Sequence, residues 1–433
     1  PPRSTLSSSS AASDVYKRPA EPRGTVVSTE HVDLAREAAR RAVVLLKNDE
    51  ASGAPALPLD PAALRRLAVV GRLADVANTG DHGSSDVRAP YVVTAVEGLR
   101  AAIPGAEIVT ADPQRGAPAA AEAARGADAA VVVVGYTAAD EGEFVDGSVA
   151  TREDLLRLYP DPVDDAQRAD RDAVMAAMGQ GLSVVGSGTA GGDRRDLHLR
   201  PEDVETIRAV AAANPRTVVV VVSAGAVLME EWVDDVPAVL LGWYAGMEGG
   251  NALADVLLGA HNPSGRLPYP IPASADHLPP LEIDATAITY DRWYGQRLLQ
   301  RDGIDALFPL GHGLAYTTYE VTRIDVGTVD RAAGHAEVRA TVRNTGDRDG
   351  RHVVQVYGSR ADGDRAGERE LLGFAVVDIP AGSSVTVPVA LDLTPFGRWD
   401  ERTRGVVVAA GPVVLEAASC WGDAGAARAE AEL

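Results

Sequence analysis

The chain has 433 residues, which at roughly 100–200 residues per domain predicts two or three domains with ample hydrophobic cores. Acidic residues outnumber basic ones by 62 to 41, and the resulting net charge of −21 makes nucleic acid or an anionic membrane surface an unexpected partner. The one cysteine, Cys420, excludes an intrachain disulfide framework and a cysteine-rich metal site.

The first stretch of the chain is expected to be a tail that leads into a helix. Residues 1 to about 28 are rich in Ser, Pro and Arg and have no hydrophobic period, so we predict a tail or linker over 1–30. The segment HVDLAREAARRAVVLL at 31–46 then has apolar residues at helical spacing, behind the N-cap candidates Ser28 and Thr29. This pattern predicts a helix over 31–46.

Short Val-rich runs then alternate with amphipathic, Ala-rich stretches. The runs lie at 67–71, 107–111, 128–136, 217–225 and 238–244, and the helix-like segments lie near 91–102, 117–125, 201–213 and 248–258. Continuous apolar strands that alternate with helices are typical of parallel sheets buried on both faces. We therefore predict an α/β domain over 31–314, with a mostly parallel sheet sandwiched between helices.

After about residue 315 the pattern changes to alternating strands separated by turn signals. Seven short strands are expected, at 320–326, 335–346, 352–359, 370–379, 384–391, 405–410 and 413–419. This spacing predicts an all-β immunoglobulin-like, or fibronectin type III-like, sandwich over 315–433.

In an open α/β sheet, catalytic and ligand-binding residues are expected in the loops that follow the strands, because ligands bind beyond the carboxyl ends of the strands. Three such loops stand out, at 71–87, 137–147 and 243–252. The second carries three carboxylates, Asp140, Glu141 and Glu143, directly after a buried strand. Crowded carboxylates can raise one pKa, as a general acid requires, although an acidic loop is more often simply solvated.

Other classes of site have little support. The sequence contains neither of the glycine motifs that bind nucleotide phosphates, no serine-hydrolase elbow, and no zinc-type spacing around the isolated His82 and His198. We therefore expect no metal and no organic cofactor.

Four segments together resemble glycoside hydrolase family 3. They are AREAARRAVVLLKN at 35–48, NTGDHGSSDVRAPYVVTAVEGL at 78–99, GNALADVLLGAHNPSGRLPYPIP at 250–272 and FPLGHGLAYTTY at 308–319. The resemblance covers residues from about 30 to 433 in the family's order. It implies the family's C-terminal α/β sandwich domain followed by its fibronectin type III-like domain.

The resemblance also implies an activity. The family's usual member is a β-glucosidase or a related retaining, exo-acting β-glycosidase, so the implied substrate is a β-linked glycoside or oligosaccharide with a terminal β-D-glycosidic bond. In that family an N-terminal TIM-type barrel carries the nucleophilic Asp. The α/β sandwich domain carries the acid/base Glu, typically as Glu-Gly ahead of a GDR-x-x-L segment. Here Glu141-Gly142 precedes GDRRDL at 192–197, so the resemblance makes Glu141 the acid/base candidate, with Glu143 as the alternative.

The resemblance also marks weaker substrate-binding candidates. Asp81, His82, Ser84 and Ser85 occupy a loop that borders the entrance subsites in relatives, and it is equally possible that this loop is simply held by its own hydrogen bonds. Asp193 and Arg194 are the remaining candidates, with a local ion pair that shapes the acid/base loop as the other interpretation.

One family feature is missing from this sequence. The nucleophile motif, Ser-Asp-Trp or Thr-Asp-Trp, occurs nowhere in the 433 residues. We therefore expect the chain to work with a barrel supplied in cis or in trans, and to be inactive by itself. Two alternatives remain open. One is a non-catalytic carbohydrate-binding or scaffold module that kept the fold, and the other is a free-standing hydrolase.

Overall fold

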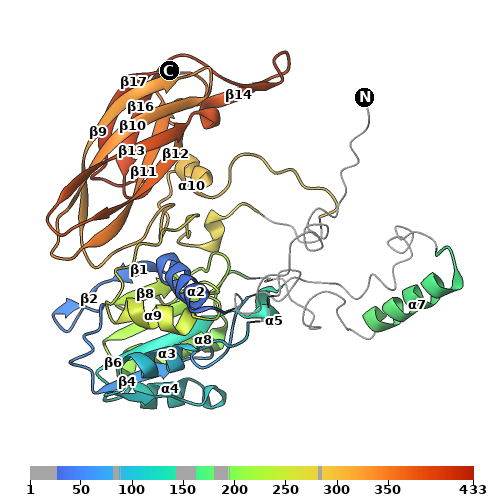
Figure 1. The fold of residues 1–433 in the computed structure, drawn as a ribbon, viewed down its shortest axis with the longest axis vertical. Helices are drawn as coiled ribbons and strands as arrows, with labels where there is room; N and C mark the ends of the chain where they lie inside the picture. The colour runs from blue at the N-terminus through green and yellow to red at the C-terminus, as the bar shows by residue number, and fades with distance from the viewer. Residues whose placement is uncertain are drawn as a thin grey trace.

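The computed structural model describes residues 27–80, 87, 89–142, 162–179, 194, 196–280 and 285–433. These residues form an α/β region, blue to yellow in Figure 1, and an all-β region, orange to red, with helix α10 (Gln296–Asp302) beside the β region. The predicted fold class, a mostly parallel sheet between helices followed by an immunoglobulin-like sandwich, is confirmed. The predicted tail lies almost entirely outside the described residues.

A six-stranded sheet forms the centre of the described α/β region, in the order β1-β8-β7-β6-β4-β5. All neighbouring strands are parallel except β1, which pairs antiparallel with β8 at one edge. The strands are β1 (Val44–Asn48), β4 (Arg66–Val70), β5 (Glu107–Val109), β6 (Ala129–Gly135), β7 (Thr217–Val222) and β8 (Ala238–Leu241), and a separate small hairpin pairs β2 (Glu50–Ala51) with β3 (Ala54–Pro55).

Both faces of this sheet are buried, which explains the uninterrupted Val runs. In β6, Val131 and Val133 belong to one core cluster, whereas Val132 and Val134 belong to the other. Helices α3 and α9 pack together over the first face, with α2 beside α9, and α4 and α8 pack together over the second. The described helices are α2 (Thr29–Ala42), α3 (Ala95–Ala102), α4 (Gly116–Ala124), α5 (Ala138–Glu141), α7 (Asp165–Gly179), α8 (Pro201–Ala213), α9 (Gly249–Leu257) and α10.

The helix predicted over 31–46 is too long. Ser28 is the N-cap, as expected, and its side chain accepts a hydrogen bond from the His31 amide at 3.4 Å. The helix ends at Ala42, however, and the following residues form β1. The four apolar residues 43–46 are all at most 2% exposed, so they need burial on both faces. A strand inside a two-faced sheet provides that burial, whereas a surface helix buries only one stripe.

The all-β region, described throughout 315–433, is a sandwich of two antiparallel sheets with its core between them. One sheet has the order β13-β10-β9 and the other β12-β11-β16-β17, while β14 and β15 form a separate ribbon. The strands are β9 (Tyr319–Asp330), β10 (His335–Asn344), β11 (Gly350–Arg360), β12 (Arg369–Ile379), β13 (Ser384–Asp392), β14 (Gly397–Asp400), β15 (Gly405–Val408), β16 (Pro412–Ala418) and β17 (Ala427–Glu432).

Two strands of this region were not predicted. β17 has the sequence ARAEAE, whose small Ala side chains give a weak hydrophobic alternation, and β14 is only four residues long. The predicted strand at 405–410 exists as β15, but it pairs only with β14 and joins neither sheet.

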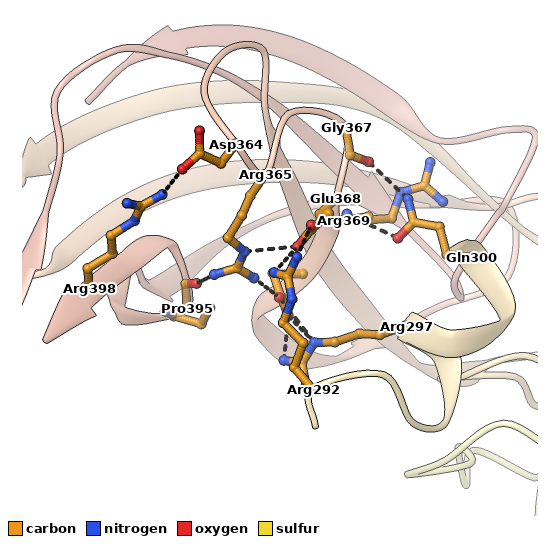
Figure 2. A network of polar contacts seen from close by, with 11 residues as sticks. Arg292, Arg297, Gln300, Asp364, Arg365, Gly367, Glu368, Arg369, Pro395 and Arg398 are labelled. Atoms are coloured by element: carbon orange, nitrogen blue, oxygen red, sulfur yellow. Dashed lines mark hydrogen bonds and ion pairs between the residues drawn. The ribbon is translucent and has the colours of Figure 1, made fainter. Parts of the chain in front are cut away.

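Arginine–carboxylate pairs join α10 and the segment before it to the start of β12 (Figure 2). Arg292 forms a two-pronged pair with Glu368 at 2.6 Å, and Arg297 contacts Glu370 through its Nη2 at 2.7 Å. Gln300 adds a hydrogen bond to the Gly367 carbonyl at 2.9 Å. Because these contacts connect residues about 70 positions apart, they help to fix the two regions relative to each other.

No helix in the described ranges is both long enough and apolar enough to cross a membrane.

Candidate active site

The candidate site lies at the carboxyl edge of the sheet, where the loops after β6, β7 and β8 meet. These strands are parallel neighbours, so their carboxyl ends lie side by side. Glu141 from the loop after β6 accepts hydrogen bonds from Ala224, which follows β7, and from Tyr244, which follows β8. Of the three loops that stand out in the sequence, those at 137–147 and 243–252 meet here through Glu141 and Tyr244, and the loop after β7 joins them although the sequence did not single it out.

A short helix presents Glu141. Helix α5 begins directly after β6, and Thr137 caps it by accepting a hydrogen bond from the Ala139 amide at 3.3 Å. Asp140 completes a capping box by accepting a hydrogen bond from the Thr137 amide at 2.9 Å. The sequence T-A-A-D-E thus fixes the direction of the turn and places Glu141 at its end.

Three groups hold the Glu141 carboxylate, and its side chain is only 7% exposed. Oε1 accepts hydrogen bonds from the Ala224 amide and the Tyr244 hydroxyl, both at 2.7 Å. Oε2 lies 3.0 Å from Nε of Arg194. A buried carboxylate with this set of partners is a well-defined group rather than a solvated surface charge.

The Arg194 side chain is also held by contacts with groups other than Glu141. It donates a hydrogen bond to the Ala226 carbonyl at 2.9 Å, and its guanidinium carbon lies 4.6 Å from the ring centre of Tyr136. A Cβ atom at Gly225 would come within 2.8 Å of the Arg194 Nη2, so the glycine leaves room for the guanidinium. Arg194 is therefore placed against Glu141 by contacts with the loop after β7 and with the end of β6.

Asp140, the neighbour of Glu141, faces a different arginine. Arg200 donates to the Asp140 Oδ1 through Nε at 2.8 Å, and Arg72 lies 4.0 Å away. Burial acts to raise the pKa of Asp140, but the hydrogen bonds from Arg200 and Thr137 outweigh it and lower that pKa. The Asp140 carboxylate therefore stabilises the loop through its contacts with Arg200 and Thr137.

Three tyrosines, Tyr136, Tyr244 and Tyr269, lie near Glu141 and Arg194, and none of them was predicted as a site residue from the sequence. Burial raises the pKa of Tyr244, and the Glu141 carboxylate raises it further. Burial also raises the pKa of Tyr136 and Tyr269, and the Tyr269 hydroxyl has no hydrogen-bond partner among the described residues. All three hydroxyls therefore stay protonated at neutral pH. The only sequence signal for Tyr244 was its place in a loop that follows a strand.

Of the other site residues predicted from the sequence, only Arg194 is among the residues that the structure describes. Arg194 is brought to Glu141, whereas Glu143, Asp81, His82, Ser84, Ser85 and Asp193 lie outside the described residues. Their roles remain predictions. Within the described ranges, no group of three or more His, Cys, Asp or Glu side chains could hold a metal ion.

A small, mostly apolar cavity is lined in part by Trp243, the chain neighbour of Tyr244, and it is too small for a sugar. Its volume is about 70 Å³, and Val133, Val220 and Trp243 are among the residues that line it. Pockets that bind small ligands usually measure roughly 300–1,000 Å³.

Comparison with known proteins gives consistent matches. The family model described as the glycosyl hydrolase family 3 C-terminal domain matches residues 43–316, and the fibronectin type III-like domain model matches 352–419. A β-glucosidase, BoGH3A, from Bacteroides ovatus is 30% identical over 362 residues, which cover 78% of this chain and 43% of the relative. An exo-α-(1→6)-L-arabinopyranosidase from Bifidobacterium longum is 29% identical over 400 residues, covering 89% and 47% respectively.

A solved structure agrees with these matches. The β-D-glucoside glucohydrolase from Trichoderma reesei superposes with a TM-score of 0.74 at 25% identity, covering 94% of this chain and 56% of that protein. The chain spans about half the length of the curated relatives it matches. The family resemblance stated from four sequence segments is confirmed.

Proposed function

The chain belongs to glycoside hydrolase family 3, and on that premise we propose that it forms the C-terminal part of a retaining, exo-acting β-glycosidase. In this proposal the substrate is a β-linked glycoside or oligosaccharide whose terminal β-D-glycosidic bond is hydrolysed. A TIM-type barrel, in the same polypeptide or in a separate chain, supplies the nucleophilic carboxylate. The proposal is supported by the match to the family's C-terminal domain and by the roughly half-length coverage of the relatives.

The observation that carries the proposal is the placement of Glu141. Its carboxylate is oriented by three loops at the carboxyl edge of the sheet, where α/β folds bind their ligands. In a retaining mechanism one carboxyl group protonates the leaving oxygen while a second, about 5–5.5 Å away, attacks the sugar carbon. The first group then removes a proton from the water that releases the sugar. We assign the first role to Glu141 and the second to the barrel.

The test replaces Glu141 by Gln in a preparation where this chain is joined to, or mixed with, its cognate barrel. The variant keeps the side chain's shape but cannot donate or accept the proton. Hydrolysis of substrates with poor leaving groups should fall by about 10²–10⁴-fold, the usual contribution of general acid catalysis. Substrates with very acidic leaving groups should still form the covalent intermediate and then stall. Azide should relieve the stall and yield a glycosyl azide of retained configuration.

Two controls make the assignment specific. Glu143→Gln, two residues away, should cost much less, and the barrel-free chain should not turn over aryl β-glucosides. If Glu143→Gln alone gives the loss that depends on the leaving group, the role belongs to Glu143. Turnover by the barrel-free chain would require a second catalytic carboxylate within the chain. It would overturn the proposal that Glu141 is the acid/base and that the barrel supplies the nucleophile.

The alternative is a non-catalytic carbohydrate-binding or scaffold module. One observation favours it. Glu141 contacts Ala224, Tyr244 and Arg194, which lie in three different segments of the chain, and a carboxylate with a purely structural role would make the same kind of contacts. In that case the cognate barrel should neither bind the chain nor gain activity from it. Activity that requires both pieces would exclude this alternative.

A further inference from the structure

A cavity lies in the β sandwich, between the turn that follows β11 and the ribbon formed by β14 and β15. We call it the ribbon cavity. Its volume is about 350 Å³, which is within the range of roughly 300–1,000 Å³ that is usual for pockets that bind small ligands. The ribbon joins neither sheet, and Figure 1 shows β14 where it projects from the sandwich. The ribbon therefore forms a wall of the cavity without completing either sheet.

Two arginines tie the ribbon to the turn that follows β11. Arg360, whose side chain is 11% exposed, donates hydrogen bonds to the carbonyl oxygens of Ala409 and Ala410, both at 2.9 Å. Arg365 donates to the Pro395 carbonyl oxygen at 2.8 Å, just before β14 begins (Figure 2). These contacts hold both strands of the ribbon at its base. The cavity is therefore preformed, and a ligand would not have to order its walls.

Part of the lining of the ribbon cavity is apolar. Phe396, Val407 and Ala409 contribute to it, and Trp399 is also among the lining residues. Val407 is 46% exposed and Trp399 is 59% exposed, so both leave apolar surface in contact with water. Burying such surface against the C–H groups of a ligand would be favourable.

Trp399 differs from the other four tryptophans of the chain. Trp232 is only 1% exposed. Trp243, Trp293 and Trp421 each lie against an aromatic ring or an arginine. Trp399 makes no ring or cation contact of this kind with another described residue. Tryptophan usually buries most of its surface, and exposed aromatic side chains are enriched where proteins bind other molecules. The exposed indole is therefore available to a ligand.

The charged groups of the ribbon cavity balance in sign. Its lining includes three arginines and three aspartates, Arg360, Arg365, Arg398, Asp362, Asp364 and Asp400. Arg360 lies 3.1 Å from the Asp362 Oδ1, and Arg398 lies 2.7 Å from the Asp364 Oδ2. Among the described residues, no group donates to the second oxygen of either aspartate. A hydroxyl group can donate to such an oxygen and accept from Arg398, whereas an ion of either sign would meet a like charge.

We propose that the ribbon cavity binds a neutral saccharide. Its hydroxyl groups bond to Asp362, Asp364 and Arg398, and its C–H surface lies against the apolar side chains and the exposed indole. A pyranose ring carries both kinds of surface, which matches the two parts of the cavity. The choice of a saccharide among neutral polar ligands rests on the proposed glycosidase function, but the site itself needs neither Glu141 nor a barrel. Such a site would raise the local concentration of a saccharide around the enzyme.

The test measures saccharide binding to the chain as it stands. Cellobiose and xylobiose are the probes, and saturation-transfer NMR and isothermal titration calorimetry measure binding, which we expect in the millimolar range. Trp399→Ala should weaken binding by about three- to ten-fold, the usual value of one aromatic contact. Asp364→Ala should weaken it by about ten-fold, because it removes a charged hydrogen-bond acceptor. The double variant should show no measurable binding at the same concentrations.

Matched controls lie elsewhere in the sandwich. Phe374 on β12 is 63% exposed and does not line the ribbon cavity, so Phe374→Ala should bind as the native chain does. Asp325 on β9 pairs with Arg323 at 2.6 Å on the surface, so Asp325→Ala should also leave binding unchanged. Glu141→Gln should bind both disaccharides normally. Loss of binding in that variant would place the saccharide at the candidate active site and overturn the inference.

Three results would overturn the inference. The first is a native chain that binds neither disaccharide at millimolar concentration. The second is native binding by Trp399→Ala and Asp364→Ala when both remain folded by circular dichroism. The third is tighter binding of glucuronate or glucosamine than of the disaccharides, because that preference would contradict the balance of charge. Since the assay involves no turnover, such a failure is separate from failure of the turnover test of Glu141→Gln.

Discussion

Replacing Glu370 by Gln should weaken the joint between the α/β region and the β sandwich. The Glu370 side chain, at the start of β12, is only 6% exposed. It accepts hydrogen bonds from the Arg297 Nη2 at 2.7 Å and from the Arg365 Nη2 at 2.5 Å. Arg297 belongs to α10, so this carboxylate is shared between an arginine of the joint and one of the sandwich itself.

The size of the effect follows from the burial of the partners. Removing one member of a buried ion pair typically costs about 3–5 kcal/mol, because the remaining charge is left uncompensated. Here the side chains of Arg297 and Arg365 are 37% and 27% exposed, so water can hydrate them in part. We therefore expect Glu370→Gln to lower the free energy of unfolding by about 2 kcal/mol, less than the buried limit.

Urea unfolding followed by circular dichroism, with intrinsic fluorescence as a second probe, measures this loss. Urea is preferable to guanidinium because it does not screen charges. The matched control is Asp364→Asn, which breaks the neighbouring contact of Arg398 with Asp364, where both side chains are more than 70% exposed. That variant should unfold like the native chain. The reasoning is refuted if the loss for Glu370→Gln is below about 0.5 kcal/mol, or if the two variants lose equal stability.

Two other substitutions test the packing and the electrostatics of the α/β region. Gly98→Ala should cost about 3 kcal/mol in thermal unfolding, because its Cβ would lie 2.2 Å from the Gly250 carbonyl oxygen, a backbone atom that cannot turn aside. Gly105→Ala, with nothing within 4 Å of the added atom, should be close to neutral, and equal losses would contradict the packing argument. The pKa of Asp140 is lowered in the fold by Arg200 and Thr137 despite burial, so its contribution to stability is complete above its unfolded pKa and disappears as the pH falls through the folded value. Asp140→Asn should therefore lower the melting temperature at neutral pH and approach the native chain as the pH falls below the ordinary aspartate range, whereas parallel profiles would exclude the ion pair as the cause.

The sequence by itself determined the architecture and the position of the main candidate. Val runs separated by amphipathic stretches indicate strands buried in a two-faced sheet, and period-two alternation after residue 315 indicates strands with one buried face, as in a sandwich. Glu141 could be selected because a resemblance marked Glu-Gly in a loop and because the loop follows a buried strand. Both signals come from residues that are close together in the chain, so they can be recognised in the sequence without knowledge of the tertiary structure.

Tertiary structure alone decided where Val43 to Leu46 belong and what surrounds Glu141. Apolar residues at 43–46 satisfy a helical period as well as a buried strand, and the choice was made by pairing with β8, almost 200 residues away. Ala224, Tyr244 and Arg194 lie 53–103 positions from Glu141 and meet it only because β6, β7 and β8 are neighbours in the sheet. Strand order depends on the packing of the whole domain and leaves no local sequence pattern, so the partners of the Glu141 carboxylate could not be predicted from the sequence.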